Sequence, residues 1–146
     1  MEVFMEPGLS ADVGFLLSRA SGAVVRATNA ALAQFGLRVR QYSVLVLACE
    51  TEAGTSQREL ATVLGLDPSQ VVLLVDELAE GGLVERRPSD ADRRAKLVVA
   101  TGVGRQVRQD AERAAASAVS ASLGRLSQPQ RSQLRDLLAR VVATTD

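Results

Sequence analysis

Two short segments near the middle of the chain, residues 56–64 and 68–80, carry apolar residues at helical spacing. The apolar positions are Leu60, Val63 and Leu64 in the first segment and Val71, Leu74, Val75 and Leu78 in the second. Side chains that recur every three or four residues share one face of an α-helix, so each segment is predicted to be an amphipathic helix. Only residues 65–67 separate the two, which is typical of a helix-turn-helix.

Residues with strong capping preferences bound both predicted helices. Ser56 and Glu59 form an S-x-x-E capping box, in which the serine accepts an early backbone N–H and the glutamate reaches back to the cap. Gly65 follows the first helix, where a left-handed residue is usually needed. Asp67 and Pro68 then supply an N-cap and a first helical residue whose missing N–H is not needed there. The sequence therefore predicts two helices in close succession.

The outer face of the second predicted helix holds candidates for contact with DNA bases. The residues predicted to face outward are Ser69, Gln70, Leu73, Asp76 and Glu77, with Val72 on the flank. A helix of this size fits the major groove, and its N-terminal residues meet base edges when it acts as a recognition helix. Ser69 and Gln70 can donate and accept hydrogen bonds. An outward Leu73 suits a thymine methyl group, or it is one of the exposed leucines that any protein carries.

A β-hairpin with a basic tip is predicted after the second helix. Residues 83–87 and 95–100 are predicted to form two strands joined by a loop over residues 88–94. The basic residues of this hairpin are Arg86, Arg87, Arg93, Arg94 and Lys96. Positive charge on a protruding loop suits DNA phosphates or a narrow minor groove, although most short charged loops are only solvated. Helix, turn, helix and basic hairpin together indicate a winged helix-turn-helix, and therefore a DNA-binding regulator.

Amphipathic helices are predicted on both sides of this region. Residues 10–35 and 103–125 show helical apolar patterns, and Ser127 with Pro129 begins a last helix. That helix carries an apolar stripe made of Leu134, Leu137, Leu138, Val141 and Val142. A monomer would leave this stripe in water, so we expect it to be buried against a twofold-related copy of the chain. The alternative is packing within one chain against the first helix.

Composition limits the classes of function. The chain has 146 residues, a hydrophobic content of 47% and a formal net charge of zero, which suits a single domain with one core. It has no histidine and one cysteine, which disfavours the usual metal sites, Ser-His-Asp chemistry and disulfide frameworks. An enzyme is therefore disfavoured as well. Cys49 is expected to be a buried small hydrophobe rather than a redox sensor. We expect no cofactor and, without a targeting or membrane-spanning segment, a cytoplasmic protein.

The order of several short motifs along the chain resembles the multiple-antibiotic-resistance regulator (MarR) family. The motifs are Leu37, Gln41, Tyr42 and Val44-Leu45, then Glu59-Leu60-Ala61, Leu64-Gly65-Leu66, Val75-Asp76 with Leu78, Gly82-Leu83-Val84 and Arg87, then Asp92-Arg93-Arg94, and Thr101 with Gly104. The resemblance implies a mainly α fold with a small β-hairpin, a winged helix-turn-helix flanked by N- and C-terminal dimerisation helices. In one domain over residues 1–146, residues 38–101 would bind DNA, and residues 10–35 and 103–146 would be the dimerisation helices.

The resemblance also implies a homodimeric repressor that binds a pseudo-palindromic DNA operator and is released by a small aromatic or anionic effector. The residues expected to contact DNA are Arg58, Ser69, Gln70, Val72, Leu73, Arg86, Arg93, Arg94 and Lys96. Arg94 would enter the minor groove from the hairpin tip, and Asp92 would hold the tip in shape. The residues expected to bind the effector are Phe15, Arg19, Arg26, Arg38, Tyr42 and Val46.

Two departures from the family pattern leave alternatives open. Val72 and Leu73 stand where many relatives carry small polar and basic residues, so the operator sequence cannot be transferred. Arg38 stands where a threonine cap is common; with Arg40 it forms a basic edge toward DNA or an anionic ligand, or only a solvated helix start. The chain could also be a protein–protein adaptor, or a DNA binder without an effector. An adaptor would have no need of the paired arginines at the hairpin tip.

Overall fold

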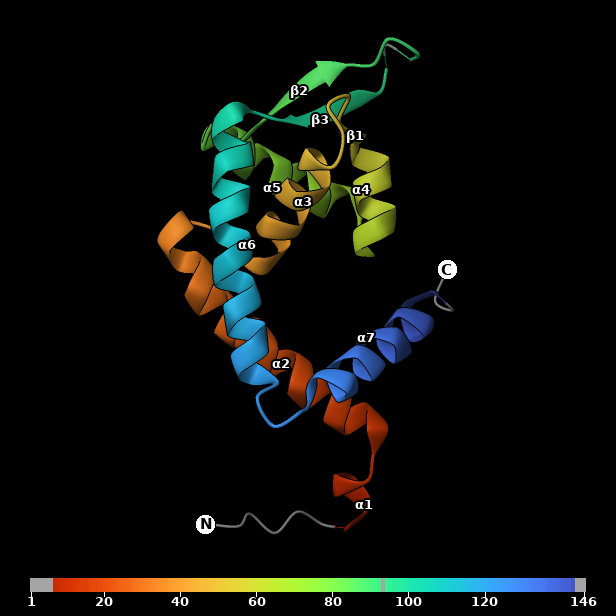
Figure 1. The fold of residues 1–146 in the computed structure, drawn as a ribbon. Helices are drawn as coiled ribbons and strands as arrows, with labels where there is room; N and C mark the ends of the chain where they lie inside the picture. The colour runs from red at the N-terminus through yellow and green to blue at the C-terminus, as the bar shows by residue number, and fades with distance from the viewer. Residues whose placement is uncertain (1–6, 93, 144–146) are drawn as a thin grey trace.

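The computed structural model describes residues 7–92 and 94–143. Its elements are α1 (Pro7–Ser10), α2 (Val13–Leu32), a short 3-10 helix (Ala33–Phe35), α3 (Val39–Cys49), β1 (Thr55–Ser56), α4 (Gln57–Leu64), α5 (Pro68–Glu80), β2 (Val84–Pro88), β3 (Lys96–Ala100), α6 (Gly102–Ser122) and α7 (Gln128–Ala143). The strands gather with α3, α4 and α5 at one end of the molecule, while α2 and α6 run away from them toward α7 (Figure 1). Within the described ranges, no helix has the length and apolar character needed to span a bilayer.

The predicted ends of the central helix pair are confirmed. Ser56 Oγ accepts the Glu59 N–H at 3.1 Å, and Gly65 adopts a left-handed φ of 64° after α4. Asp67 and Pro68 begin α5 as N-cap and first helical residue. The carboxylate of Glu59, however, accepts the Thr55 hydroxyl at 2.9 Å instead of reaching back to the cap. Only the serine half of the expected capping box forms, because the Glu59 carboxylate is engaged by Thr55.

One core lies between the central helices and the sheet. Its largest fully buried side chains are Leu32, Val44, Leu45, Leu60, Val71, Val75 and Val98. The prediction that Val63 belongs to the apolar face of α4 is wrong, because this side chain is 64% exposed. Ala61 is buried with Leu60 instead, which rotates the apolar stripe of α4 toward residues 60, 61 and 64 and leaves Val63 on the outer side.

The predicted hairpin is part of a three-stranded antiparallel sheet in the order β1-β3-β2. Arg86 of β2 and Thr55 of β1 both lie opposite Val98 of β3. The sequence did not predict β1, which has only two residues. Gly54, just before it, has a φ of 86°, and a Cβ there would lie 2.6 Å from the Val98 carbonyl oxygen. Glycine therefore permits the close approach that adds this strand.

The start of α6 is fixed against the turn between α5 and β2. Thr101 Oγ1 accepts the Gly104 N–H at 3.0 Å as the N-cap, and the same hydroxyl donates to the Gly82 carbonyl at 2.6 Å. The Thr101 N–H donates to the Leu83 carbonyl at 3.0 Å. A Cβ on Gly104 would meet that carbonyl oxygen at 1.9 Å. The T-x-x-G motif is therefore the joint between the long helix α6 and the winged region.

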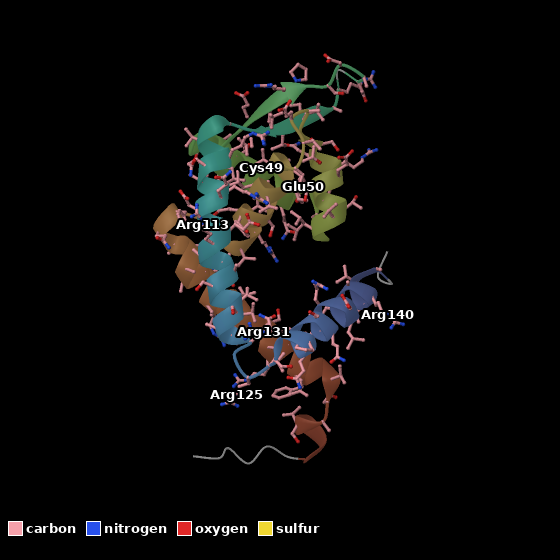
Figure 2. All side chains as sticks on the ribbon, viewed as in Figure 1. Cys49, Glu50, Arg113, Arg125, Arg131 and Arg140 are labelled. Carbon is pink, nitrogen blue, oxygen red and sulfur yellow. The ribbon has the colours of Figure 1, made fainter. Side chains whose placement is uncertain are left out.

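The terminal helices leave apolar side chains uncovered. α2 packs along α6, but Val13 near its start is 77% exposed. Arg131 anchors the first turn of α7 to the end of α6, with Nη1 donating to Ser120 Oγ at 2.9 Å (Figure 2). No residue of α7 is buried, and Leu137 in its apolar stripe is 57% exposed. Four of the five residues of the stripe are therefore exposed to solvent in a single chain, as predicted, and only Leu134 is partly buried, so packing within one chain does not cover the stripe.

Candidate DNA-binding surface

The first two turns of α5 present an uncovered face. Ser69, Gln70 and Val72 are exposed, and Leu73 is 62% exposed. Val71 and Val75 on the opposite side are fully buried and fix the rotation of the helix. Gln70 Oε1 accepts the N–H of the N-cap residue Asp67 at 3.2 Å, so the side-chain amide of Gln70 helps to cap the start of α5. That contact leaves the Gln70 NH₂ group as the part free to meet a ligand.

Strands β2 and β3 and the loop that connects them form the wing. Arg86 of β2 joins this wing to both helices of the helix-turn-helix, α4 and α5. Its guanidinium lies 2.7 Å from Asp76 Oδ1 on α5 and donates to Gln57 Oε1 on α4 at 2.8 Å. It also donates to the Val72 carbonyl at 3.3 Å. The Arg86 side chain is half-buried by these contacts. Arg86, which was predicted to contact DNA, holds β2 against α5 through these contacts.

Local hydrogen bonds shape the tip of the wing. Asp92 Oδ1 accepts the Arg94 N–H at 3.0 Å, and the Asp92 carbonyl accepts the Ala95 N–H at 3.0 Å. Ser89 Oγ accepts the Asp92 N–H at 3.4 Å, which links the start of the loop, directly after β2, to its tip. These contacts hold Arg94 at the tip with its side chain exposed. Arg93, also predicted to contact DNA, lies outside the described residues.

An open groove of about 640 Å³ separates the start of α4 from the wing. Its lining includes three exposed cations, Arg58 from α4 and Arg94 and Lys96 from the wing. The acidic side chains in the lining are Glu59 and Asp92, and each accepts a hydrogen bond from within the chain. Positive groups from two elements therefore converge on one groove, as an anionic backbone would require.

A second pocket, of about 360 Å³, lies between α2, α3 and α5. It is lined by Val25, Asn29, Arg38, Val39, Arg40, Gln41, Leu74 and Glu77. Asn29 Oδ1 accepts the Val39 N–H at 2.9 Å, and Gln41 Oε1 accepts the Arg38 N–H at 2.9 Å. The Gln41 amide also donates to the Glu77 carboxylate of α5. One wall of this pocket is therefore linked directly to the helix that presents Leu73.

The residues predicted to bind the effector do not all gather at this pocket. Of these six residues only Arg38 lines the pocket, and Phe15, Arg19, Arg26, Tyr42 and Val46 do not. At about 1.5 Å rise per residue, Phe15 lies about 21 Å from Asn29 along α2. Tyr42 faces α6 instead: burial raises the pKa of its hydroxyl, Glu112 raises it further, and Arg108 lowers it. The apolar periodicity of the sequence does not reveal which face of α3 meets α6. The set of residues that line this pocket could therefore not be derived from the sequence.

Cys49 lies at the end of α3 against α6 (Figure 2). Arg105 Nη1 donates to the Cys49 carbonyl at 3.1 Å. Burial raises the pKa of the Cys49 thiol, and the nearby Arg105 and Arg108 only partly oppose that shift. A raised pKa keeps the thiol protonated near neutral pH, which agrees with a packing role rather than a reactive one.

Comparison with known proteins identifies the family. The MarR family model matches residues 35–95, which contain the helix pair and most of the wing. The HTH-type transcriptional repressor Rv2887 of Mycobacterium tuberculosis is 30% identical over 132 residues, covering 90% of this chain and 94% of the relative. The chain belongs to the MarR family. It is accordingly a transcriptional regulator of the winged helix-turn-helix type.

Solved structures of other MarR-family proteins share the whole fold. CouR from Rhodococcus jostii RHA1, bound to p-coumaroyl-CoA, is 49% identical over 94% of this chain and 96% of its own, with a TM-score of 0.86. A CouR repressor bound to a 23-mer DNA duplex is 29% identical over 96% of this chain and 99% of its own, with a TM-score of 0.87. Rv2887 in complex with salicylic acid is 27% identical over 90% of this chain and 96% of its own, with a TM-score of 0.71.

Several residues of the MarR-family site were not predicted from the sequence. Gln57 and Asp76 hold Arg86, while Asn29, Gln41 and Glu77 border the second pocket. Gln57 lies 29 positions from Arg86, and Gln41 lies 36 positions from Glu77. Contacts this far apart in sequence depend on the packing of α3, α4 and α5, and no local pattern encodes them. Gln41 and Asp76 carried a signal as parts of the family motifs, but nothing in the sequence indicated their partners.

Proposed function

We propose that this MarR-family chain is a homodimeric repressor that places α5 in the major groove and the wing tip against the neighbouring minor groove. The observation that carries the proposal is the convergence of Arg58, Arg94 and Lys96 on one groove beside the exposed start of α5. Cations at this position neutralise phosphates and orient the protein on the duplex, while α5 meets base edges. The target is chromosomal DNA, so we place the protein in the cytoplasm and assign it no catalytic step.

Two copies of this surface would read a pseudo-palindromic operator. MarR-family regulators act as dimers. A twofold axis through the terminal helices would present two copies of α5, each in a major groove, with half-sites about one helical turn of DNA or a multiple of it apart. In this arrangement Ser69, Gln70, Val72 and Leu73 face bases, and Arg58, Arg94 and Lys96 face phosphates or the minor groove. Arg86 acts through α5 as a positioning residue.

Replacing Arg94 tests the DNA-binding proposal. With a duplex that the wild-type protein selects from a random pool, Arg94→Ala should weaken binding by about 1–3 kcal/mol, because a groove contact is lost from each wing. Fluorescence anisotropy titrations at several salt concentrations give the affinity and the salt slope. The thermal melting midpoint should not change, since the side chain is exposed.

Arg113→Ala is the matched control, because Arg113 is also an exposed arginine but lies on α6, outside the lining of the groove. It should bind the duplex like the wild type. Equal affinity of Arg94→Ala and Arg113→Ala would remove the wing from the DNA contact. Failure of the wild-type protein to select any duplex would favour the adaptor alternative.

We propose that the pocket between α2, α3 and α5 binds the effector, an aromatic molecule with a carboxylate or another anionic group. Val25, Val39 and Leu74 supply apolar walls, while Arg38 and Arg40 supply positive charge suited to an anion. Related proteins have been crystallised with p-coumaroyl-CoA and with salicylic acid, both of this chemical class. The dimer can hold its two α5 helices at a spacing that fits the operator or at one that does not. A ligand here lowers DNA affinity only by the factor by which it binds the second state more tightly than the first.

The effector proposal predicts that Arg38→Ala weakens the response to ligand and leaves binding of the free protein to DNA nearly unchanged. Salicylate and p-coumaroyl-CoA are the probes, and release of the labelled duplex is the readout. Loss of one charged contact should raise the concentration needed for half-release by about tenfold or more. Tyr42→Phe is the control, because Tyr42 does not line this pocket. A normal response in Arg38→Ala, or no response to either probe in the wild type, would contradict the proposal.

A further inference from the structure

The exposed start of α5 is unusual in its lack of positive charge. Helix α5 reads Pro-Ser-Gln-Val-Val-Leu-Leu-Val-Asp-Glu-Leu-Ala-Glu and contains no lysine or arginine. The commonest specific contact in the major groove is a bidentate arginine or lysine on guanine O6 and N7. This helix has no side chain that can make it. The cations of the surface come from α4 and the wing, where they suit the DNA backbone and the minor groove.

Of the three acidic side chains of α5, Asp76 and Glu77 are already paired within the chain, and Glu80 lies at the far end of the helix from its exposed start. Asp76 pairs with Arg86, and Glu77 accepts the Gln41 amide. A free carboxylate could accept from the cytosine amino group, but these two are bonded within the chain. The side-chain oxygen of Gln70 already accepts the Asp67 N–H, so a two-point contact to adenine would have to share that oxygen or break the bond at the helix start. Ser69 and the Gln70 NH₂ group are the polar groups of this face that remain for bases.

Two apolar side chains make up most of the remaining exposed face at the start of α5. Leu73 is 62% exposed and its neighbour Val72 is 37% exposed, in the part of α5 that enters a major groove first. The core holds Val71 and Val75 on the other side of the helix, so the orientation of both side chains is fixed. The one strongly apolar feature on a major-groove floor is the C5 methyl group of thymine. Exposed apolar groups at this position therefore have a matching partner in DNA.

We infer that Leu73, flanked by Val72, reads thymine methyl groups, and that the operator half-site is A·T-rich where α5 lies. The inference rests on the proposed DNA-binding function and adds its sequence preference. Each methyl group that Leu73 covers leaves water, which corresponds to about fourfold in affinity. Two symmetric half-sites would give about fifteenfold for one thymine position in each. A scattered surface leucine without a role would give no dependence on this methyl group.

Replacing thymine by deoxyuridine tests the inference, since it removes the methyl group and keeps every hydrogen-bonding group. A duplex is first selected from a random pool by the wild-type protein, and each thymine of the two half-sites is then changed to deoxyuridine in symmetric pairs. At least one pair should weaken binding by about fifteenfold, measured by anisotropy titration. The same change outside the half-sites is the DNA control and should have no effect.

Protein variants assign the methyl contact to its residue. Leu73→Ala should bind the thymine and deoxyuridine duplexes with nearly equal affinity. Val63→Ala removes an equally exposed apolar side chain from α4 and should keep the full difference. Because Leu73 is exposed, the variant should fold normally, which a thermal melt checks.

The outcomes separate the inference from the function on which it rests. Selected half-sites without thymine, a wild-type protein indifferent to deoxyuridine, or an undiminished difference in Leu73→Ala would each overturn the thymine reading while DNA binding stands. Selection of no duplex at all would overturn both. Equal deoxyuridine sensitivity in the wild type and Val63→Ala, with its loss in Leu73→Ala, is the expected result.

Discussion

Arg86 joins three elements through one guanidinium group. Gln57 begins α4, Asp76 lies in the middle of α5, and Arg86 itself belongs to β2. A planar guanidinium can serve several acceptors in fixed directions, whereas a lysine ammonium is a single flexible point charge. Arg86 therefore helps to hold the wing against α5, together with the buried side chains of Leu83 and Val84, although it need not touch DNA.

Arg86→Ala should lower the free energy of unfolding by about 1–2 kcal/mol, since a half-buried charged donor loses its partners but Asp76 can be hydrated. It should also weaken DNA binding, because the wing is no longer held against α5. Arg87→Ala is the comparison: Arg87 is exposed and, among the described residues, pairs with its exposed strand neighbour Glu85, so stability should change by less than about 0.5 kcal/mol. Urea denaturation measures both, and equal effects of the two variants would argue against the role given to Arg86.

At the scale of elements, the joint between α6 and the wing has no spare room. The backbone of α6 at Gly104 lies so close to the Leu83 carbonyl that any side chain would have to displace one of them. Thr101 closes the same joint with hydrogen bonds on both sides. The long helix α6 is thereby held rigidly to the start of β2.

Gly104→Ala should destabilise the protein by about 3 kcal/mol or more, because its Cβ would overlap backbone atoms rather than a movable side chain. Gly102→Ala, two residues earlier in the same helix, has no atom within 4 Å of the added Cβ. Alanine there should change stability by less than about 1 kcal/mol and favour the helix. Thermal melts of the two variants give the comparison; similar melting midpoints would mean that the joint can yield.

Elements with local signals were predictable from the sequence, and contacts between elements were not. Gly65, Asp67 and Pro68 act through their own backbone neighbours, so they set helix ends whatever surrounds them. Val63 has the right spacing for the core but faces outward, because burial of Ala61 depends on where α4 meets its neighbours. Strand β1 exists only because Gly54 brings the chain against β3.

The same difference between local and long-range contacts applies to the wing and to the pocket between α2, α3 and α5. The wing tip was predictable because Asp92 and Arg94 interact within two positions. Arg86 has the same charge and lies in the same hairpin, yet its orientation is set by side chains on α4 and α5. Arg38 alone of the predicted effector residues lines the pocket between α2, α3 and α5. Which helix faces meet there is a property of tertiary packing.

At the scale of the whole molecule, the exposed stripe of α7 predicts a dimer. Light scattering on the full chain should give about twice the chain mass of 15.4 kDa. Leu137→Asp should shift the protein toward the monomer and lower its melting temperature, because a charge would be buried in the interface. Leu73→Asp is the control with a similarly exposed leucine on α5, and it should stay dimeric. A full-length chain that remains monomeric at micromolar concentration would contradict the expectation.

The uncovered stripe of α7 also sets how the operator would respond to the amount of protein. If the DNA-competent form assembles from two chains, its concentration follows the square of the chain concentration while most chains are single. While most operators are free, halving the number of chains then reduces operator occupancy about fourfold instead of twofold. Leu137 and its neighbours would in this way turn gradual changes in synthesis or degradation of the regulator into a sharp threshold in transcription.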